Sequence, residues 1–376
     1  MTAMDAMVPL VDLEPMNTLV RAEIVGRWEQ LIDQGEFILG PALEAFETDF
    51  ADYCGTSHGI GVASGTDAIE IALRALDIGP GDEVVVPALT FAATGIAVLR
   101  SGATPVFADI DPATLLIDPT CVESKIGHRT AAVLAVNLYG QIAPLERLGA
   151  LAARHGLALL EDGAQSQGAR RLGRRVGVAS SFYCTSFYPT KNLGAWGDGG
   201  ALVTGDRALA DAARAIRNYG SAIKYDHGRF GFNSRLDPLQ SCVLAAKLPY
   251  LDRWNAIRAR AADWYNSRLA DVPQLTRPAV DEGNEHVWHL YTVRHPDRDR
   301  LAEELRRHGI GSGVHYPSPL HLLPVFASPD TPPGSLPVAE EAAATLLSLP
   351  LFVGITESQQ ERVVSSIDGL IPVGPE

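Results

Sequence analysis

A chain of 376 residues, 46% of them hydrophobic and 20% charged, is too apolar for a disordered or fibrous protein and is long enough to bury a large core. Its formal net charge of −14 argues against nucleic acid or an anionic membrane as partner, because both repel an acidic surface. The length predicts a large domain over residues 1–249 and a small C-terminal domain over 250–376 that includes a bridging helix.

The N-terminus and the cysteines predict a cytoplasmic protein without a metal site. The first fifteen residues contain acidic residues and no basic segment, so we do not expect a signal peptide. The longest uncharged apolar run, 84–99, is shorter than the ~20 residues of a membrane span. The cysteines form no CxxC pair and have no histidines nearby, as is typical of reduced thiols; they are Cys54, Cys121, Cys184 and Cys242.

Helices are expected over 19–32 and 41–51, and a third begins at the sequence SGTDA, residues 64–68. Ser64 is placed to cap this third helix. A small, glycine-containing turn before a helix also exposes backbone N–H groups that can hold a phosphate. Capping alone remains an alternative explanation for the serine.

Short apolar runs then alternate with segments of helical spacing, such as 94–99 and 145–155. This alternation predicts an α/β fold with a mostly parallel sheet covered by helices on both faces. Ligands of such sheets bind at the carboxyl ends of the strands. The strands are expected over 83–87, 105–108, 131–136, 157–160, 181–185 and 201–204.

Asp162 follows the fourth of these runs, at the end of a strand expected to be buried. A buried carboxylate needs a partner, because an unpaired one is costly. The alternatives to a ligand-binding role are a helix cap and a structural ion pair.

Lys191 is the only charged residue between residues 176 and 197. An ammonium group among Phe, Tyr, Leu, Gly and Trp is poorly solvated, so the pKa of Lys191 is expected to fall and a neutral, nucleophilic amine to become accessible near neutral pH. Lysines that form Schiff bases need such surroundings. The alternative is that Lys191 extends to the surface from an apolar strand end.

The second half predicts a capped helix over 206–219 and another that starts at Asp237–Pro238, is interrupted at Pro249 and continues to Leu269. The arginines at 170, 171, 174 and 175 are expected in a solvated hairpin. The C-terminal part is expected to contain strands over 287–294 and 311–316 and helices over 300–308, 337–347 and 357–367, which suffices for a small α/β domain.

Taken together, the motifs of this chain resemble those of the DegT/StrS sugar aminotransferases, which are pyridoxal-phosphate enzymes with the aspartate aminotransferase-type fold. The resemblance covers nearly the whole chain. It rests on SGTDA at 64–68, PALTFAAT at 87–94, EDGAQ at 161–165, SFYPTKNLG at 186–194, GDGG at 197–200, RNYGS at 217–221, NSRLD at 233–237 and HYPSPLH at 315–321.

The resemblance implies a role for each matching residue around pyridoxal 5′-phosphate. Lys191 matches the lysine that forms the Schiff base with the cofactor and later moves a proton. Asp162 matches the carboxylate that pairs with the ring nitrogen and keeps it protonated. Gln165 matches the side chain near the ring hydroxyl, and Phe91 the aromatic residue that stacks on the ring. A buried core position for Phe91 and a surface position for Gln165 are the alternatives.

The resemblance also implies how the phosphate is held. Thr66 and Ser186, with Gly65 and Asp67 as helix-start amides, match the phosphate cradle. Asn233 matches a phosphate contact from the neighbouring subunit, which implies a homodimer with shared active sites. Ser186 as a strand-end residue and Asn233 as a turn residue are the alternatives.

In this family the amino acceptor is usually a nucleotide-linked keto sugar and the donor L-glutamate. Lys224 and Tyr225 follow RNYGS as in members that aminate C3 of a dTDP-linked 3-keto-6-deoxyhexose, which is the substrate we expect. The residues expected to contact the substrates are Tyr188, Lys224, Tyr225, Arg235, His315, Tyr316 and His321.

Three alternatives differ in class from this expectation. Some relatives are dehydratases with histidine in place of the lysine, and Lys191 argues against that activity. A 4-keto sugar or cyclitol aminotransferase would share most motifs. A non-catalytic regulatory protein on the same fold is also possible.

Overall fold

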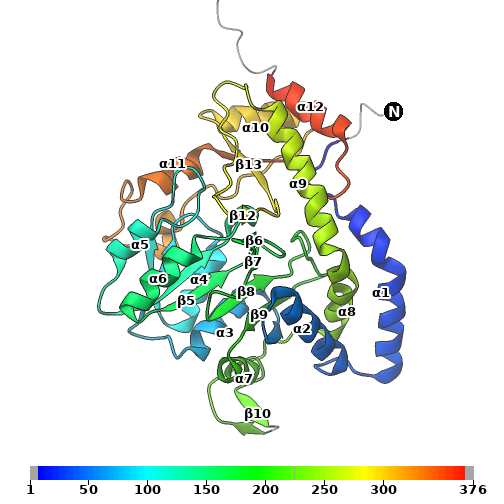
Figure 1. The fold of residues 1–376 in the computed structure, drawn as a ribbon, viewed down its shortest axis with the longest axis vertical. Coiled ribbons are helices and arrows are strands. Elements are labelled where there is room, and N and C mark those ends of the chain that lie inside the picture. The colour runs from blue at the N-terminus through cyan, green and yellow to red at the C-terminus, as the bar shows by residue number, and fades with distance from the viewer. Residues whose placement is uncertain (1–6, 224, 369–376) are drawn as a thin grey trace, which may run out of the picture.

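The structure is a computed structural model that describes residues 7–223 and 225–368. Its centre is a seven-stranded sheet in the order β1-β9-β8-β5-β4-β2-β3 (Figure 1). Only β9 runs antiparallel to its neighbours, so the prediction of a mostly parallel sheet is confirmed. The strands are β1 His58–Val62, β2 Glu83–Pro87, β3 Thr104–Ala108, β4 Thr130–Val136, β5 Ala158–Asp162, β8 Phe182–Ser186 and β9 Gly200–Thr204.

The sequence analysis missed β1, whose sequence HGIGV contains two glycines. Glycine has a low strand propensity, and nothing local compensates for it here. Close packing explains the glycines: a Cβ on Gly59 would lie 2.3 Å from the carbonyl oxygen of Glu47, and one on Gly61 would lie 2.8 Å from Leu43.

Helices cover both faces of the sheet, because successive strand residues point to opposite sides. Val84 and Val86 of β2 pack in one core with α3 Gly65–Ala75, α4 Ala92–Ser101 and α7 Arg207–Ile216. Val85 faces the other core. That core is formed by α2 Pro41–Cys54, α5 Pro119–Lys125, α6 Leu145–His155 and α8 Pro238–Lys247.

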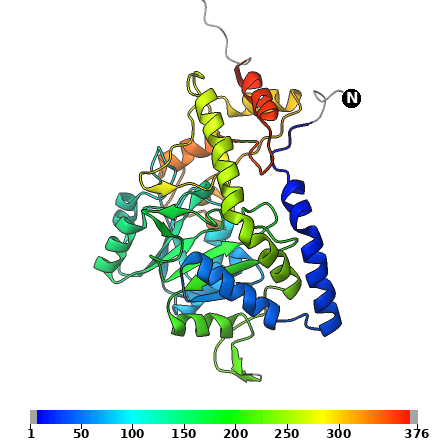
Figure 2. The ribbon, with the colours of Figure 1, turned by 45° about the vertical axis from the view of Figure 1, so that its right-hand side comes forward.

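Two long helices flank this domain (Figures 1 and 2). The first, α1 Glu14–Gln34, packs through Val20 and Ile24 against α8. The second, α9 Leu251–Arg268, runs from the large sheet towards the C-terminal elements. Between α8 and α9 the short 3-10 helix η2, Leu248–Tyr250, contains Pro249, which accounts for the predicted interruption. The predicted domain division falls inside η2.

The C-terminal elements form a second core around a two-stranded antiparallel sheet of β13 Tyr291–Arg294 and β14 Leu346–Leu349. Helices α10 Arg298–Arg307 and α12 Glu357–Asp368 pack on it. Helix α11, Pro337–Thr345, instead packs against the large domain through Ala339 and Ala342.

Three C-terminal predictions are wrong. The expected strand over 287–294 begins only at Tyr291, because the chain before it bonds to the large domain, where the carbonyl of Gly140 accepts from the amide of Val287. The expected strand over 311–316 is reduced to a single bridge between Gly313 and Ser348, because the chain leaves the sheet there and the carbonyl of His315 accepts a hydrogen bond from the hydroxyl of Tyr139. The expected helix over 337–347 ends at Thr345. Pairing of β14 with β13 overrides the helix propensity of the leucines that follow.

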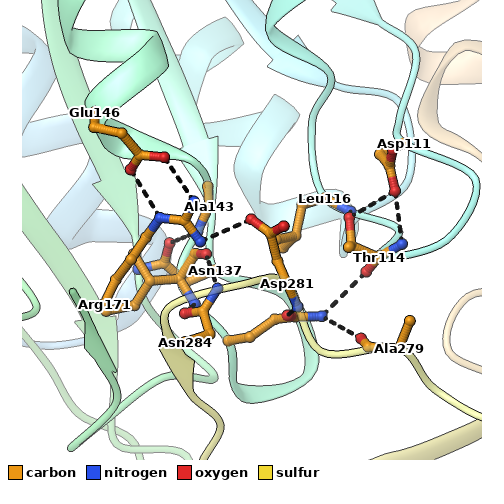
Figure 3. Close-up of polar contacts among 12 residues, drawn as sticks. Asp111, Thr114, Leu116, Asn137, Ala143, Glu146, Arg171, Ala279, Asp281 and Asn284 are labelled. Carbon is orange, nitrogen blue, oxygen red and sulfur yellow. Dashed lines mark hydrogen bonds and ion pairs between the residues drawn. The ribbon is translucent and has the colours of Figure 1, made fainter. Parts of the chain in front are cut away.

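The arginine hairpin is present as β6 Arg170–Arg171 and β7 Arg174–Arg175, and β12 Asn284–Glu285 pairs with β6. The expectation that all four arginines are solvated is wrong for Arg171, whose exposed fraction is 9%. Its guanidinium lies between the carboxylates of Glu146, at 2.6 Å, and Asp281, at 2.7 Å (Figure 3).

Neighbouring amides extend this connection. The side chain of Asn284 exchanges hydrogen bonds with the backbone of Ile142, and Gln141 donates to the carbonyls of Thr114 and Ala279 (Figure 3). These contacts attach segment 279–285 to the large domain, directly before the residues that reach the carboxyl ends of the strands.

A two-stranded hairpin of β10 Ser221–Ile223 and β11 Asp226–His227 projects from the large domain in both views (Figures 1 and 2). Among the described residues, no helix is both long and apolar enough to cross a membrane.

Candidate active site

A cavity of about 330 Å³ lies at the carboxyl ends of the parallel strands, where the sequence analysis placed the ligand site. Its wall comes from the start of α3, the junction of β2 and α4, the ends of β4, β5 and β8, the loop after β8, and two C-terminal segments. The residues singled out from the sequence that line it are Gly65, Thr66, Phe91, Asp162, Gln165, Ser186, Tyr188, Lys191, His315 and Tyr316.

Lys191 lies in a tight loop after β8. Its amide donates to the carbonyl of Tyr188 at 2.9 Å, and the ammonium of the buried Lys247 donates to the carbonyl of Gly194 at 2.8 Å. Burial lowers the pKa of Lys191 to about 8, and the carboxylate of Asp162 acts in the opposite direction. The predicted fall in pKa is therefore present, and a neutral amine is available near neutral pH.

Asp162 ends β5 at the base of the cavity. Its carboxylate accepts hydrogen bonds from the hydroxyl of Thr94 at 2.7 Å and from the amide of Ala164 at 3.2 Å. Burial raises the pKa of Asp162, whereas these hydrogen bonds and Lys191 lower it. A protonated ring nitrogen would give this buried carboxylate the cationic partner that it needs.

The start of α3 forms a cradle suited to a phosphate. The hydroxyl of Ser64 accepts from the amide of Asp67 at 3.1 Å, while the amides of Gly65 and Thr66 lie in the first turn, where a helix offers no carbonyl acceptor. A Cβ on Gly65 would lie 2.7 Å from Cβ of Ser186, so only glycine lets the two segments approach this closely. An anion can thus reach both backbone amides.

Asp67 does not have the role that the sequence analysis gave it. Its amide is occupied by the helix cap, and Asp67 is outside the lining of the cavity. Its carboxylate pairs with Arg100 at 2.9 Å and accepts from the hydroxyl of Ser234 at 2.8 Å. Asp67 therefore holds α3 in place instead of donating to a ligand.

Gln165 and Phe91 both line the cavity. Gln165 is buried, accepts from the amide of Tyr139 at 2.6 Å and donates to the hydroxyl of Tyr316 at 3.0 Å, so it is not a surface residue. Phe91 is 56% exposed, with its ring centroid 5.5 Å from that of Tyr316, so it is not a core residue. An aromatic face at a cavity rim suits stacking on a planar ring.

The other predicted residues that the structure describes do not line the cavity. Asn233 is exposed and pairs through its backbone with Asn218, whose side-chain oxygen accepts from Arg235 at 3.1 Å. Tyr225 is 83% exposed on the projecting hairpin. Lys224 lies outside the described residues.

His321 is 1% exposed and contacts the carboxylate of Glu340 at 3.0 Å. The structure therefore does not bring His321 to the cavity, and a structural role fits its surroundings better than substrate contact.

The sequence analysis missed residues that the structure brings into or behind the wall. Thr94 was inside a quoted motif, but only the fold shows that its hydroxyl reaches Asp162. His289 lines the cavity from segment 287–290, where its only sequence signal is a polar residue within the aromatic run HVWHLY. Within the described ranges, no group of three or more His, Cys, Asp or Glu side chains could hold a metal ion.

Comparison with known proteins agrees with this geometry. Residues 19–368 match the model of the DegT/DnrJ/EryC1/StrS aminotransferase family. The chain is 47% identical over 360 residues to dTDP-3-amino-3,4,6-trideoxy-alpha-D-glucose transaminase of Streptomyces venezuelae, which covers 96% of this chain and 95% of that protein.

Two solved structures are similar over almost the same length. The crystal structure of S. venezuelae DesV in complex with a ketimine intermediate has a TM-score of 0.95 and 47% identity, and the match covers 97% of this chain and 98% of that one. The structure of NtdA from Bacillus subtilis with bound cofactor PMP has a TM-score of 0.89 and 32% identity, with 96% and 84% covered.

Proposed function

The chain belongs to the DegT/DnrJ/EryC1/StrS aminotransferase family, and from this premise we propose that it moves an amino group from L-glutamate to C3 of a dTDP-linked 3-keto-6-deoxyhexose. The 47% identity to a dTDP-sugar transaminase supports the substrate. The observation that carries the chemistry is the buried amine of Lys191, with its lowered pKa, in one cavity with Asp162.

The cavity residues suit pyridoxal 5′-phosphate. Gly65, Thr66 and Ser186 would hold the phosphate, Asp162 the ring nitrogen, and Phe91 one ring face. Gln165, fixed by the amide of Tyr139, would lie near the ring hydroxyl. When bound, this cofactor supplies an electron-withdrawing ring that stabilises negative charge on the substrate carbon.

The chain's own residues supply the proton transfers and the orientation. The pKa of Lys191 is about 8, so both forms of its amine are accessible. The neutral amine can take a proton from the substrate carbon, and the charged ammonium can return one. The hydrogen bond from Thr94 favours the charged form of Asp162, against the effect of burial on its pKa. Tyr316, fixed by Gln165, narrows the cavity beside Phe91 and limits the access of water.

A second copy of the chain completes the proposed site. Among the described residues that line the cavity, Lys191 is the only lysine or arginine, whereas a nucleotide diphosphate requires several cations or donors. Asn233 and Arg235 lie outside their own cavity, and the β10–β11 hairpin projects into solvent. We therefore propose a homodimer in which these segments serve the neighbouring subunit. The four free cysteines support a cytoplasmic protein.

The test follows the absorbance of purified protein loaded with pyridoxal phosphate. We expect L-glutamate to bleach the absorbance of the bound cofactor and the dTDP-linked 3-keto sugar to restore it. If 4-keto sugars or cyclitols restored the absorbance and the 3-keto sugar did not, the proposed substrate would be wrong. A protein that takes up no cofactor, or whose absorbance ignores glutamate, would indicate a non-catalytic protein on this fold.

A further inference from the structure

Two side-chain amides connect the ring of His289 to the backbone. The amide nitrogen of Asn255 donates to the carbonyl of Gln167 at 2.9 Å, and that of Asn192 donates to the carbonyl of Val287 at 2.9 Å. Asn192 also donates to the side-chain oxygen of Asn255 at 2.8 Å. Because a backbone carbonyl can only accept, the orientation of both amides is determined.

These orientations determine which nitrogen of His289 carries the proton. The side-chain oxygen of Asn192 lies 3.1 Å from Nδ1 of His289, and an amide oxygen can only accept. Nδ1 therefore donates, and in a neutral imidazole Nε2 is left as an acceptor. The ring is 7% exposed, and burial followed by the charge of Lys191 lowers the pKa of His289 well below its usual value, so the neutral form is maintained.

The backbone of His289 is held from both sides. A Cβ on Gly140, which has a φ of 121°, would lie 2.8 Å from the amide nitrogen of Trp288 and 2.9 Å from that of His289, so Gly140 packs directly on this segment. The buried guanidinium of Arg258 donates to the carbonyl of Leu351 at 3.0 Å and to those of Trp288 and His289 at 3.4 and 3.5 Å. The ring therefore has little freedom to turn.

Nε2 is the ring nitrogen left for a ligand. His289 lines the cavity together with Lys191, and in the described part of the chain the structure shows no hydrogen bond to Nε2. His315 lines the same cavity but differs. Its Nδ1 contacts the hydroxyl of Ser348 at 2.9 Å, which can donate or accept and so selects no tautomer.

We propose that His289 contacts bound substrate through Nε2 as a hydrogen-bond acceptor for an N–H or O–H group, and that Asn192 and Asn255 are positioning residues that select this tautomer. The inference rests on the proposed function, because both proposed substrates bring such donors: the amino group of glutamate and the hydroxyls of the keto sugar. A neutral acceptor at this place favours a donor group and disfavours a carboxylate or carbonyl oxygen.

Neutron diffraction from perdeuterated full-length protein near pH 7 tests the tautomer directly. We expect deuterium on Nδ1 of His289 and none on Nε2. Deuterium on Nε2 would overturn the proposal, and this readout does not depend on turnover or on any variant.

Two substitutions test the contact. In His289→Asn the new amide can take the place of Nδ1 and keep the bond to Asn192, but Nε2 is lost; we expect kcat/KM to fall roughly 10- to 100-fold. His289→Gln places an oxygen near the position of Nε2 and should recover part of the loss. His128→Asn, at an exposed turn before β4, is the control.

The two half-reactions distinguish the sources of the donor group. A loss confined to the glutamate half-reaction assigns the contact to the amino group, and one confined to the dTDP-keto-sugar half-reaction assigns it to a sugar hydroxyl. Unchanged rates of His289→Asn in both halves, or equal losses in the Asn and Gln variants, would overturn the contact. A wild-type protein that transaminates neither substrate would instead overturn the proposed function.

Discussion

Lys191 destabilises the folded protein when no cofactor is bound, because its ammonium is poorly hydrated. Burial lowers its pKa to about 8 from 10.5, so between these values the unfolded chain binds more protons and the stability of the cofactor-free protein rises with pH. Lys191→Met removes this effect. We expect the free energy of unfolding to rise by roughly 1–3 kcal/mol at pH 7, a range that is discounted for partial contact of the side chain with cavity water. This gain should shrink between pH 8 and 10.5.

Urea unfolding of the cofactor-free protein at pH 7, 9 and 10.5 measures this difference. Lys125→Met, at the end of α5, is the matched control for the loss of a lysine. A Lys191→Met protein that is less stable than wild type at pH 7 would contradict the burial argument. The same variant should show no absorbance change with glutamate.

Thr94 is a second residue whose effect has a predictable sign. Its hydrogen bond favours the charged form of Asp162, while burial raises the pKa of that carboxyl. Thr94→Val keeps the shape and removes the donor, so the pKa of Asp162 rises further and activity should be lost at a higher pH on the acid side of the profile. We expect kcat/KM to fall roughly tenfold at neutral pH. Thr120→Val, at an exposed position, should leave the pH profile of kcat/KM unchanged.

At the level of elements, the start of α3 depends on its close approach to the end of β8. Gly65→Ala would place a Cβ 2.7 Å from Cβ of Ser186 and push the two segments apart. We expect a loss of roughly 1–3 kcal/mol in unfolding free energy and weaker binding of pyridoxal phosphate, with less effect on pyridoxal, which has no phosphate. Spectroscopic titration with both compounds measures this.

Gly26→Ala in α1 is the matched control, because nothing lies within 4 Å of the added Cβ there. This substitution should stabilise the protein by roughly 0.5–1 kcal/mol. If the Gly65→Ala protein lost equal amounts of affinity for pyridoxal phosphate and for pyridoxal, the start of α3 would not be the segment that holds the phosphate.

The arginine hairpin makes a testable connection between elements. Arg171→Met leaves the carboxylates of Glu146 and Asp281 without their shared partner. We expect the free energy of unfolding to fall by roughly 1–3 kcal/mol, a loss that is limited because both acids keep some contact with water. Arg174→Met, on the exposed side of the same hairpin, should change stability by less than roughly 0.5 kcal/mol. Thermal unfolding compares the two, and similar losses would show that Arg171 is not the connecting residue.

At the level of the whole molecule, shared sites make a specific prediction about mixtures. Lys191→Ala and Asn233→Ala proteins should each be nearly inactive as pure dimers, because every site lacks one of the two residues. After unfolding and refolding together, the mixed dimer contains one site with both residues. Activity should therefore return to roughly a quarter of the wild-type value when half of the dimers are mixed, each with one intact site.

Sedimentation provides the companion measurement, with an expected mass twice the 40.2 kDa of the chain. A monomer, or a mixture without regained activity, would contradict the shared site and leave Asn233 as a turn residue.

Features encoded locally were predicted correctly from the sequence. The limits of β2 and α6 match the predicted ranges, because each has a clear apolar period between strong turn signals. The surroundings of Lys191 also depend on its immediate neighbours in sequence, so the direction of its pKa shift could be anticipated. The family motifs identified most of the cavity residues, because the motifs SGTDA, PALTFAAT, EDGAQ and SFYPTKNLG lie at the carboxyl ends of β1, β2, β5 and β8.

Only the tertiary structure decided how distant segments combine. Asp67 pairs with Arg100, and His321 contacts Glu340. His289 lines the cavity and is connected to α9 through the side-chain amides of Asn192 and Asn255. Sequence by itself thus determined which strand ends carry the chemistry and that Lys191 has apolar neighbours, since both follow from local pattern. Hydrogen-bond partners far apart in the chain were settled by the fold, because burial leaves each polar group only the partners that packing brings within reach.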